Sequence, residues 1–314
     1  MRRVAVLGGG PDAEREVSLD SSRAVAEALD LCPGIDSRLE MIDRPRTLSG
    51  IDADVLFPVL HGPWGEGGPL QAILEADGRP FVGSGSVPAT LAMDKLQTKT
   101  EIERLGIPTP FAAAFNPARA GCDVEPPAVI KPVSQGSSVG LYVVSSRGEL
   151  ESAAADAAAK AYLAAPGGWM IERLIAGREV TAGLADLGDG LTPLPLIEIR
   201  PAEALYDYKA KYSRSDTAYI IDPKLPVGVA DRINRAAVRA AESIGVRHLA
   251  RVDFMIDETG TPWCLEINTI PGFTATSLVP KAAAAQGIAM PELCRALVEA
   301  AERDHSRPST AHAE

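Results

Sequence analysis

The clearest pattern of apolar and polar positions spans residues 251–268. Apolar and polar side chains alternate along two runs that are separated by a short polar turn containing a glycine. Because successive side chains of a strand point to opposite faces, this alternation predicts a β-hairpin. With the turn centred between the two strands, antiparallel pairing sets Asp253 opposite Glu266 and Arg251 opposite Asn268.

Two acidic side chains therefore face each other in the predicted hairpin. Directly paired positions have Cβ atoms roughly 4.5–5.5 Å apart, so ionised carboxylates at Asp253 and Glu266 repel each other. A hard divalent cation removes this repulsion, and carboxylate and amide oxygens are its preferred ligands. The alternative is that Arg251 holds both acids on a solvated face. The same alternation places Cys264 on the face of Glu266 and Asn268.

Shorter patterns divide the rest of the chain into alternating strands and helices, which predicts an α/β protein with a mostly parallel N-terminal sheet. A glycine, Gly106, is expected to close the helix that begins near Lys95. The expected strands are 3–7, 55–60, 80–82, 128–131, 141–144, 169–172 and 179–185, and the expected helices are 14–29, 70–76, 95–105, 149–163, 280–286 and 291–303.

Length and composition indicate a multidomain globular protein. At 314 residues the chain exceeds what one core usually supports. We expect an N-terminal substrate-binding α/β domain (1–93), two α+β domains (94–177 and 178–305) and a disordered tail (306–314). The net charge of −11 argues against a nucleic-acid partner, although a few lysines can still bind a small anion.

Cysteine usage and hydropathy indicate the compartment. Four cysteines are scattered without a CxxC pair, which favours reduced thiols over a disulfide framework or a zinc site. No apolar run reaches the roughly 18 residues of a membrane span. We therefore expect a cytoplasmic protein with no membrane partner.

A glycine- and serine-rich loop, residues 134–140, connects two expected strands. Small residues let backbone N–H groups approach an anion, and hydroxyls add donors, so such a loop can cover phosphates. A plain flexible turn is the alternative. Lys131, at the end of the preceding strand, favours phosphate binding by this loop because it supplies a positive charge beside it. Lys95 can do the same from the start of its helix.

Several acidic and polar positions carry weaker signals. Glu172, in an apolar strand, can offer hydrogen bonds to a base, and Glu179 lies within reach of a ribose. For both residues the alternative, which is the more common case, is an exposed acid without a ligand. Glu14, at the start of the first helix, can hold an ammonium group or only compensate the helix dipole. The stretch 206–226 is long and irregular enough to be a lid. The segment 271–277 can face an oxyanion or a carboxylate.

Taken in order, these segments resemble the D-alanine–D-alanine ligases, a family of the ATP-grasp superfamily. The resemblance runs almost from end to end and includes seven motifs, which are GGGPDAEREVSLDSS, HGPWGEGGPLQ, GSGSVPATLAMDKLQTK, VIKPVSQGSSVG, YDYKAKY, RVDFMID and EINTIPGFTATSLVP. It implies a three-domain ATP-grasp fold in which the central and C-terminal domains sandwich ATP.

The resemblance also implies a role for each matched residue. The nucleotide would contact Lys95, Lys131, Ser138, Glu172, Leu174, Ile175, Glu179, Lys211 and, through the metal, Glu266. Two Mg²⁺ ions, for which Mn²⁺ is a possible substitute, would bind Asp253, Glu266 and Asn268. The two D-alanines would contact Glu14, Val17, His61, Tyr212, Arg251, Gly272, Ser277 and Leu278. Glu14, Ser137 and Tyr212 would link the first domain to the lid, and Arg251 with the Gly272 N–H would stabilise the oxyanion.

The implied reaction is ATP-dependent ligation through an acyl phosphate, for peptidoglycan precursors, in a homodimer. Two departures from the family pattern concern packing, since Leu174 and Leu205 replace frequent aromatics, and the Pro63-Trp64 insertion has no clear consequence; no charged catalytic group is lost. The alternatives are the same chemistry with D-lactate or D-serine as second substrate, a ligase for another amino-acid pair in secondary metabolism, or an ATP-sensing binding protein. Tyr212 favours D-alanine within the family.

Overall fold

A computed structural model describes residues 1–119, 124–165, 167–201 and 217–306. The predicted site residues Lys211 and Tyr212, most of the predicted lid and most of the predicted tail lie outside these ranges. The strands are β1 Arg2–Gly9, β2 Ile35–Ile42, β3 Val55–Pro58, β4 Ala112–Phe115, β5 Ala128–Pro132, β6 Tyr142–Val144, β7 Trp169–Arg173, β8 Arg178–Asp186, β9 Leu191–Pro193, β10 Ile197–Arg200, β11 Ala218–Ile221, β12 Leu249–Ile256 and β13 Pro262–Asn268. The helices are α1 Arg15–Asp30, α2 Gly62–Gly65, α3 Pro69–Asp77, α4 Ser86–Met93, α5 Lys95–Arg104, α6 Arg147–Ala159, the 3-10 helix η1 Ala161–Ala164, α8 Val229–Ser243, α9 Leu278–Ala285 and α10 Met290–Ser306.

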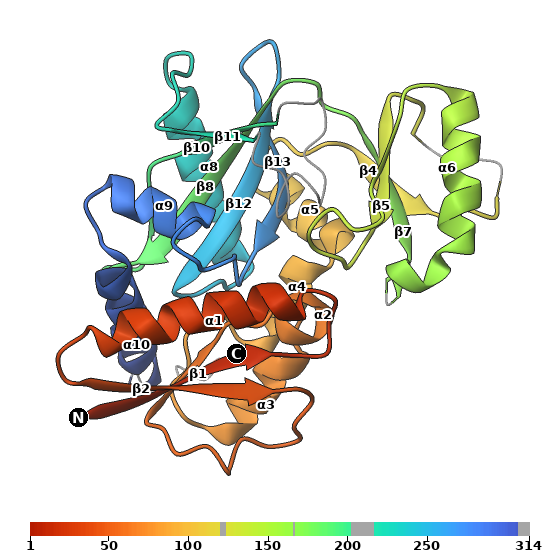
Figure 1. Cartoon of the computed structure of the whole chain (residues 1–314). Coiled ribbons are helices and arrows are strands. Elements are labelled where there is room, and N and C mark those ends of the chain that lie inside the picture. The colour runs from red at the N-terminus through yellow and green to blue at the C-terminus, as the bar shows by residue number, and fades with distance from the viewer. Residues whose placement is uncertain (120–123, 166, 202–216, 307–314) are drawn as a thin grey trace, which may run out of the picture.

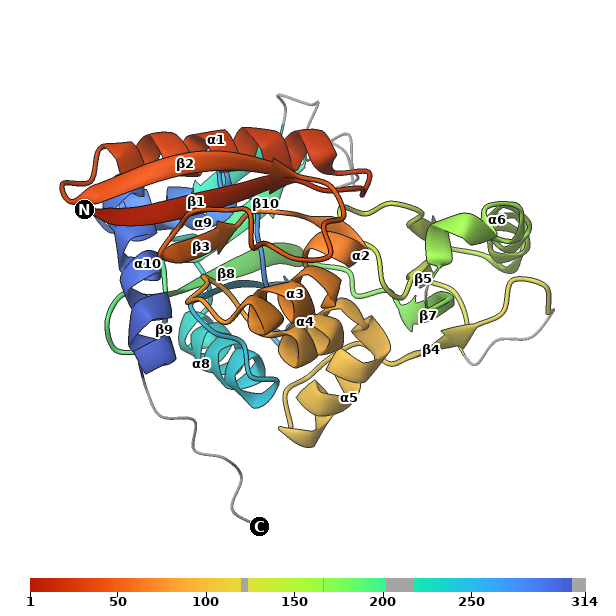
Figure 2. The ribbon, with the colours of Figure 1, turned by 90° about the horizontal axis from the view of Figure 1, so that it is seen from below.

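The N-terminal sheet is parallel, as its alternation of strands and helices predicts. Its order is β2-β1-β3. Side chains of β1 alternate between two apolar layers: Val4 and Val6 pack with α1, whereas Ala5 and Leu7 pack with α3. Figure 2 shows α1 and α3 on opposite sides of this sheet. Because both faces are covered, the carboxyl ends of the strands and the loops that follow them are the parts left to meet the rest of the molecule.

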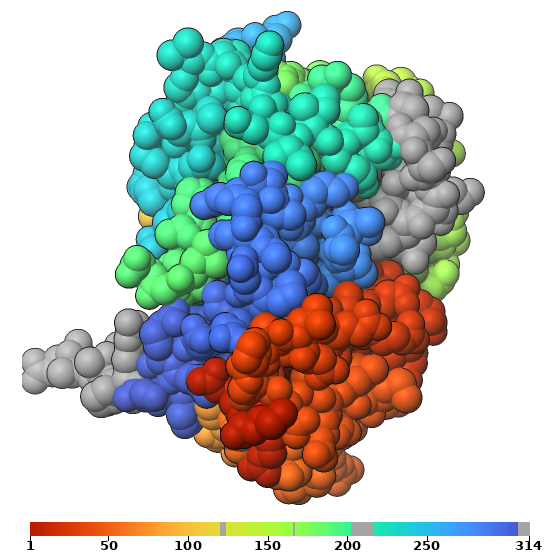
Figure 3. Space-filling view, turned by 60° about the vertical axis from the view of Figure 1, so that its left-hand side comes forward, coloured from red at the N-terminus to blue at the C-terminus, as the bar shows by residue number. Residues whose placement is uncertain are grey.

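The C-terminal helices complete the core of the N-terminal sheet. Leu293, Leu297 and Val298 of α10 belong to the same buried cluster as Val4 and Val25. Figure 3 shows the residues of α9 and α10, in blue, filling the space between the N-terminal residues and residues 180–250. The two ends of the described chain therefore fold as one packed layer.

The middle of the chain forms a four-stranded antiparallel sheet of order β4-β7-β5-β6. Its outer face is covered by α6, whose Leu150, Ala154 and Ala157 pack on strand residues such as Ile130 and Ile171 (Figure 1). The loop 134–140 leaves from β5, so it lies at one end of this sheet.

A six-stranded antiparallel sheet follows, with the path β11-β10-β8-β12-β13 and β9 paired to β8. The amphipathic helix α8 covers one face through Ile233, Ala237 and Ala240. Ile102 of α5 and the nearby Ile107 belong to this core rather than to the core of the four-stranded sheet. The domain boundaries near residues 93 and 177 therefore stay predictions.

The register of the hairpin β12–β13 is confirmed: Asp253 pairs with Glu266 and Arg251 with Asn268. Beyond Asp253 the register shifts, so that Phe254 pairs with Cys264. The prediction that Cys264 shares a face with Glu266 was wrong because this β-bulge inserts one residue, and Cys264 instead lies in the apolar core.

Two elements also differ from the sequence-based expectations, and one predicted cap is confirmed. Residues 80–82 contribute only a single parallel bridge, Leu56 to Phe81, instead of a strand. The helix expected to run to residue 163 ends at Ala159 and is followed by η1. The capping glycine is confirmed: Gly106 has φ +70° and its N–H donates to the Glu103 carbonyl, while the Ile107 N–H reaches the Ile102 carbonyl. None of the helices in the described ranges is long and apolar enough to span a bilayer.

Candidate active site

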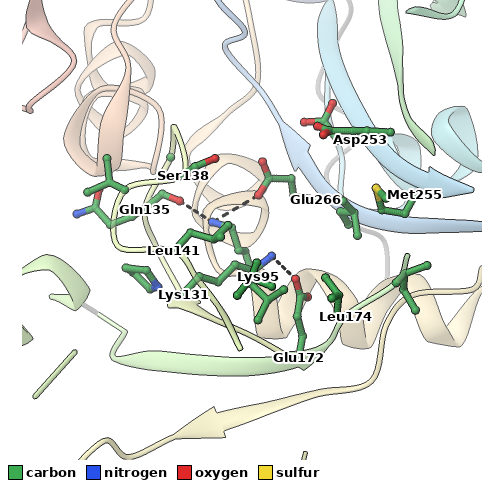
Figure 4. A pocket seen from close by; sticks show the side chains of 18 of the residues that line it. Lys95, Lys131, Gln135, Ser138, Leu141, Glu172, Leu174, Asp253, Met255 and Glu266 are labelled. Atoms are coloured by element: carbon green, nitrogen blue, oxygen red, sulfur yellow. Dashed lines mark hydrogen bonds and ion pairs between the residues drawn. The ribbon is translucent and has the colours of Figure 1, made fainter. Parts of the chain in front are cut away.

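A cavity of about 200 Å³ lies between the four-stranded and six-stranded sheets (Figure 4). One wall is formed by residues of β5, β6 and β7 and by the loop 134–140, and the other by residues of β8, β12 and β13. Nine of the predicted site residues line it: Lys95, Lys131, Ser138, Glu172, Leu174, Ile175, Glu179, Asp253 and Glu266. Val129, Leu141 and Met255 also line the cavity, and their apolar side chains suit a flat aromatic ring.

Three buried charges form the end of the cavity at β5 and β7. Lys131 donates to Glu172 Oε1 at 2.6 Å, and Lys99 Nζ lies 3.0 Å from Glu172 Oε2. Burial favours the neutral acid, but Lys131 and Lys99 outweigh it and hold the pKa of Glu172 below its ordinary value. Burial likewise works to lower the pKa of Lys131, but Glu172 and Glu266 raise it above the ordinary value. Lys131 and Glu172 therefore form a buried ion pair at this end of the cavity, while burial lowers the pKa of Lys99 against the opposing charge of Glu172.

Lys95 brings a second ammonium group to the cavity from the start of α5. Asp94 caps this helix, since its Oδ1 accepts the Leu96 and Gln97 N–H groups. Lys95 Nζ donates to the Gln135 carbonyl at 2.6 Å and lies 3.7 Å from Glu266 Oε2 (Figure 4). Burial lowers the pKa of Lys95, and Glu266 counteracts this. The lysine thus joins the loop 134–140 to β13.

The loop 134–140 is held in an unusual backbone conformation. Ser137 and Ser138 have φ of 53° and 57°, a region that residues with a Cβ rarely adopt. The hydroxyl of Ser137 donates to the carboxylate of Glu14, which precedes α1. A Cβ on Gly136 would meet Glu14 Oε2 at 3.2 Å, so glycine permits this close approach. Two of the three residues predicted to link the first domain to the lid therefore touch.

The carboxylates of the hairpin lie on the cavity side and not on a solvated face. Asp253 is 6% exposed, accepts three hydrogen bonds from Arg251 at 2.9–3.2 Å, and accepts one from Thr181 at 2.6 Å. Asn268 Oδ1 accepts the Ile270 N–H. Two carboxylates on paired positions and one amide oxygen form an all-oxygen donor set, which fits Mg²⁺. The described residues contain no cluster of three or more histidine, cysteine or acidic side chains that could hold a metal.

A second cavity of about 310 Å³ adjoins the first, since Glu179 and Asp253 line both. It is bounded by α1, the hairpin and the start of α9. Five of the residues predicted to contact amino-acid substrates line it: Val17, Arg251, Gly272, Ser277 and Leu278. Ser277 and Leu278, at the start of α9, line it, so the cavity lies at the N-terminal end of a helix, which favours an anion there.

His61 lies beside these cavities without lining either of them. Its Nδ1 is 3.0 Å from the Ile270 carbonyl, while its buried Nε2 meets no hydrogen-bond partner among the described residues. Burial lowers the pKa of the imidazole, and the carboxylate of Glu14 works in the opposite direction. A neutral ring with one open nitrogen, next to a carboxylate, suits an ammonium or carboxyl group of a small substrate.

Two charged residues near the site were missed by the sequence analysis. Lys99 lies one helical turn after Lys95, and this spacing on one helix face is the signal that could have identified it. Glu66, which directly follows α2, is 5% exposed and accepts the Gly62 N–H. Burial first, and then the charge of Glu14, raise the pKa of Glu66 to about 8. Nothing in the local sequence distinguishes Glu66 from an exposed loop acid.

The fold and the site together define a class of enzyme. Two antiparallel sheets enclose a cavity that is lined by lysines and by the paired carboxylates of the hairpin, and a second cavity adjoins it. This is the arrangement of the ATP-grasp ligases, which hold a nucleotide between two such sheets.

Comparisons with known proteins identify the family. The family model described as "D-ala D-ala ligase C-terminus" matches residues 118–299. A D-alanine–D-alanine ligase of Anaeromyxobacter sp. (strain Fw109-5) is 41% identical over 308 residues, which covers 96% of this chain and 97% of the relative. The chain therefore belongs to the D-alanine–D-alanine ligase family, whose members depend on ATP and Mg²⁺.

Solved structures agree with this assignment. The D-alanine–D-alanine ligase of Bacillus anthracis, complexed with ATP, superposes with a TM-score of 0.78 at 27% identity and covers 97% of this chain and 99% of that one. The VanG D-Ala:D-Ser ligase of Enterococcus faecalis superposes with a TM-score of 0.80 at 26% identity and covers 96% of this chain and 99% of that one. The fold is thus common to ligases that differ in their second substrate.

Proposed function

We propose that this protein joins two molecules of D-alanine to D-alanyl-D-alanine with consumption of ATP, through an acyl phosphate, to supply peptidoglycan precursors. The observation that carries the proposal is the near-complete match, at 41% identity over 96% of the chain, to a protein that bears this name. The cavity geometry supports it, since Lys95, Lys131 and the hairpin carboxylates line one cavity together with apolar side chains.

We assign the nucleotide to the cavity between the two sheets. Its phosphates would lie near Lys95, Lys131 and the loop that contains Ser138, where positive charge and backbone N–H groups gather. Its base and ribose would lie towards Glu172, Leu174, Ile175 and Glu179. Mg²⁺ held by Asp253, Glu266 and Asn268 would neutralise charge on the transferring phosphoryl group. Lys211, outside the described residues, would act from the lid.

We assign the amino acids to the second cavity. The first D-alanine would place its ammonium group near Glu14 and His61 and its carboxylate between the two cavities. That carboxylate is a poor electrophile until one of its oxygens attacks the γ-phosphorus and ADP leaves. The neutral amine of the second D-alanine would then attack the carbonyl carbon, and phosphate would leave. Its own carboxylate would be bound near Ser277 and Leu278, at the start of α9.

Arg251 and the Gly272 N–H would stabilise the tetrahedral oxyanion. Arg251 fits this role because three hydrogen bonds to Asp253 orient its guanidinium group and it lines the second cavity. Val17 would contact the substrate methyl group from α1. Ser137, which donates a hydrogen bond to Glu14, would link that residue to the lid residue Tyr212, which lies outside the described residues. A closed lid would keep water from the acyl phosphate.

The identity of the second substrate needs a separate observation, because a D-Ala:D-Ser ligase has the same fold. Tyr212 and the relatives at about 40% identity, which bear the D-alanine–D-alanine name, favour D-alanine. We further propose that the protein is a cytoplasmic homodimer and that its domains divide near residues 93 and 177. Sedimentation velocity would test the dimer, and limited proteolysis would test the boundaries.

The decisive experiment is phosphate release from ATP and Mg²⁺ with D-alanine alone, and then with D-lactate or D-serine added, with products identified by mass. The proposal expects D-alanyl-D-alanine from D-alanine alone. Turnover only when another acid is added would overturn the substrate assignment and keep the ligase mechanism. Absence of turnover with every D-amino acid tested, in protein that binds ATP, would instead indicate a nucleotide-binding protein that is not a ligase.

A further inference from the structure

Lys99 is a buried cation that the proposed mechanism does not use. It is 4% exposed, lies one turn after Lys95 on α5, and lines neither cavity. Its Nζ donates to Thr109 Oγ1 at 2.9 Å and to the Pro110 carbonyl at 3.4 Å. The same Nζ lies 3.0 Å from Glu172 Oε2. A buried ammonium group must be compensated by nearby acceptors or an opposite charge, because burial of an unpaired charge is costly.

Thr109 extends this contact to the hairpin. Its hydroxyl accepts from Lys99 and donates to the Cys264 carbonyl at 2.7 Å, and the Cys264 N–H donates to the Pro108 carbonyl at 2.8 Å. These bonds occupy β13 at its β-bulge, two residues before Glu266. Lys99 therefore connects the base end of the cavity, at Glu172, with the strand that carries the proposed metal ligand.

The two oxygens of Glu172 are held by different lysines. Oε1 accepts a hydrogen bond from Lys131. Oε2 lies 3.0 Å from Nζ of Lys99, whose ammonium group has three protons and can serve Glu172 as well as Thr109 and Pro110. The two lysines therefore fix the orientation of the carboxylate, and each of its oxygens has a second lone pair for a further donor.

Lys99 also affects the charge that Lys131 presents to the cavity, because both lysines pair with Glu172. Glu172 shares its negative charge between two ammonium groups, which leaves part of the charge of Lys131 for an anion in the cavity. Without Lys99, Glu172 would be paired with Lys131 alone. Its carboxylate would then neutralise Lys131 fully, and Oε2 would be free to turn towards it.

We propose that Lys99 is a positioning residue that makes the nucleotide site selective for adenine. It fixes Glu172 so that the carboxylate accepts a hydrogen bond from the exocyclic amino group of the base, and it preserves the charge of Lys131 for the phosphates. This inference rests on the proposed nucleotide site but not on the identity of the amino acids. Inosine nucleotides carry a carbonyl oxygen in place of the amino group, so a fixed carboxylate repels them.

The test is calorimetric binding of ATP and of ITP, with Mg²⁺ and without amino acid, to the wild-type protein and to Lys99→Met. We expect the variant to bind ATP about tenfold more weakly and to lose most of the preference for ATP over ITP. Lys99→Arg should retain more of both. Lys160→Met is the control, because Lys160 pairs with Asp156 on the surface of α6 and should leave both constants unchanged.

Thr109→Val provides a second variant if Lys99→Met does not fold, since it keeps every charge and removes only the hydroxyl that orients Lys99. We expect a change in the same direction of about threefold. A folded variant that weakens ATP and ITP equally, or neither, would overturn the proposal, because a merely structural lysine does not move their ratio. Wild-type protein that binds neither nucleotide would overturn it as well. Selective ATP binding without D-alanine turnover would refute the proposed reaction alone.

Discussion

Glu266 and Asp253 face each other across two strands, yet their surroundings differ. Asp253 is already held by Arg251 and Thr181, whereas Glu266 lies 3.7 Å from Lys95, on the side of the proposed phosphates. Glu266→Gln keeps the shape of the side chain and removes one charge from the donor set. We expect turnover to fall by roughly a factor of ten to a hundred and half-saturation to need more Mg²⁺.

A Mg²⁺ titration of phosphate release measures both effects. Glu299→Gln is the matched control, because Glu299 lies on the exposed face of α10 and its loss should change neither quantity. If Glu266→Gln shows the wild-type rate and the wild-type Mg²⁺ dependence, the hairpin is not the metal site.

Glu66 predicts a pH dependence of stability. Burial and the charge of Glu14 raise its pKa to about 8 in the folded protein, against 4.5 ordinarily. Between these values the unfolded chain releases the proton and the folded chain keeps it, so this carboxyl destabilises the fold progressively as pH rises from 4.5 to 8. The destabilisation is absent below pH 4.5 and complete above pH 8. The total effect is on the order of 5 kcal/mol at most.

Urea unfolding of Glu66→Gln and wild type at pH 5, 6.5 and 8 isolates this contribution. Relative to wild type, we expect the variant to gain stability steadily with pH, because a neutral amide stays neutral. A constant difference across the three pH values would mean that Glu66 is ionised throughout.

The helix α5 shows how an element can carry function at one end. Asp94 caps it and so fixes the backbone at Lys95, the first helical residue. Ser146 caps α6 in the same way through the Glu149 N–H, but no proposed site residue lies in α6. Each cap contributes about 1 kcal/mol. Asp94→Ala should therefore lower stability by about 1 kcal/mol and also raise the KM for ATP by a few fold.

Ser146→Ala separates the two effects of this prediction. It should cost a similar amount of stability, measured by urea unfolding, and leave the KM for ATP unchanged. A cap whose only function is to stabilise its helix would make the two variants kinetically identical to wild type, and that result would contradict a link between the cap and Lys95.

The hairpin shows how far an element can be predicted from sequence. Alternation and a central turn were enough to pair Asp253 with Glu266, because strand periodicity is a local property. The bulge was not predictable, since its cause is tertiary: Cys264 bonds with Pro108 and Thr109, which are distant in sequence. The helix α8 was missed although its buried positions recur at helical spacing.

The same distinction separates the site residues that were found from those that were missed. Lys131 and the loop 134–140 were found because a strand, a lysine and small residues follow one another directly. Lys99 and Glu66 acquire their importance from partners far along the chain, Glu172 in one case and Glu14 in the other. A local sequence pattern cannot predict that charged residues from two separate elements are buried next to each other.

At the scale of the whole molecule, His248 joins the N-terminal layer to the six-stranded sheet. Its Nδ1 accepts the Gly83 N–H at 2.9 Å, and its Nε2 lies 3.1 Å from Asp304 Oδ2 on α10. A ring that accepts at Nδ1 must carry its single proton on Nε2, so the contact to Gly83 needs neutral imidazole. Arg247 and Asp186 are the other charged groups that act on it.

Protonation of His248 should therefore loosen this junction. Burial, together with the charge of Arg247, lowers its pKa below 6.5, against the opposing influence of Asp304 and Asp186. The depressed pKa means that the contribution of His248 to stability is complete above pH 6.5. It is lost as pH falls below 6.5, because the unfolded chain then binds a proton that the folded chain does not.

The variant that tests this junction is His248→Asn, because position 248 has φ +65° and asparagine tolerates that conformation while its side-chain oxygen can still accept from Gly83. Between pH 7 and pH 5 we expect the free energy of unfolding of the wild type to fall by about 1–2 kcal/mol more than that of the variant. His305→Asn, at an exposed position, should follow the wild type. Parallel curves for wild type and His248→Asn would assign the acid sensitivity to other groups, of which buried His61 is the first to examine, since burial lowers its pKa as well.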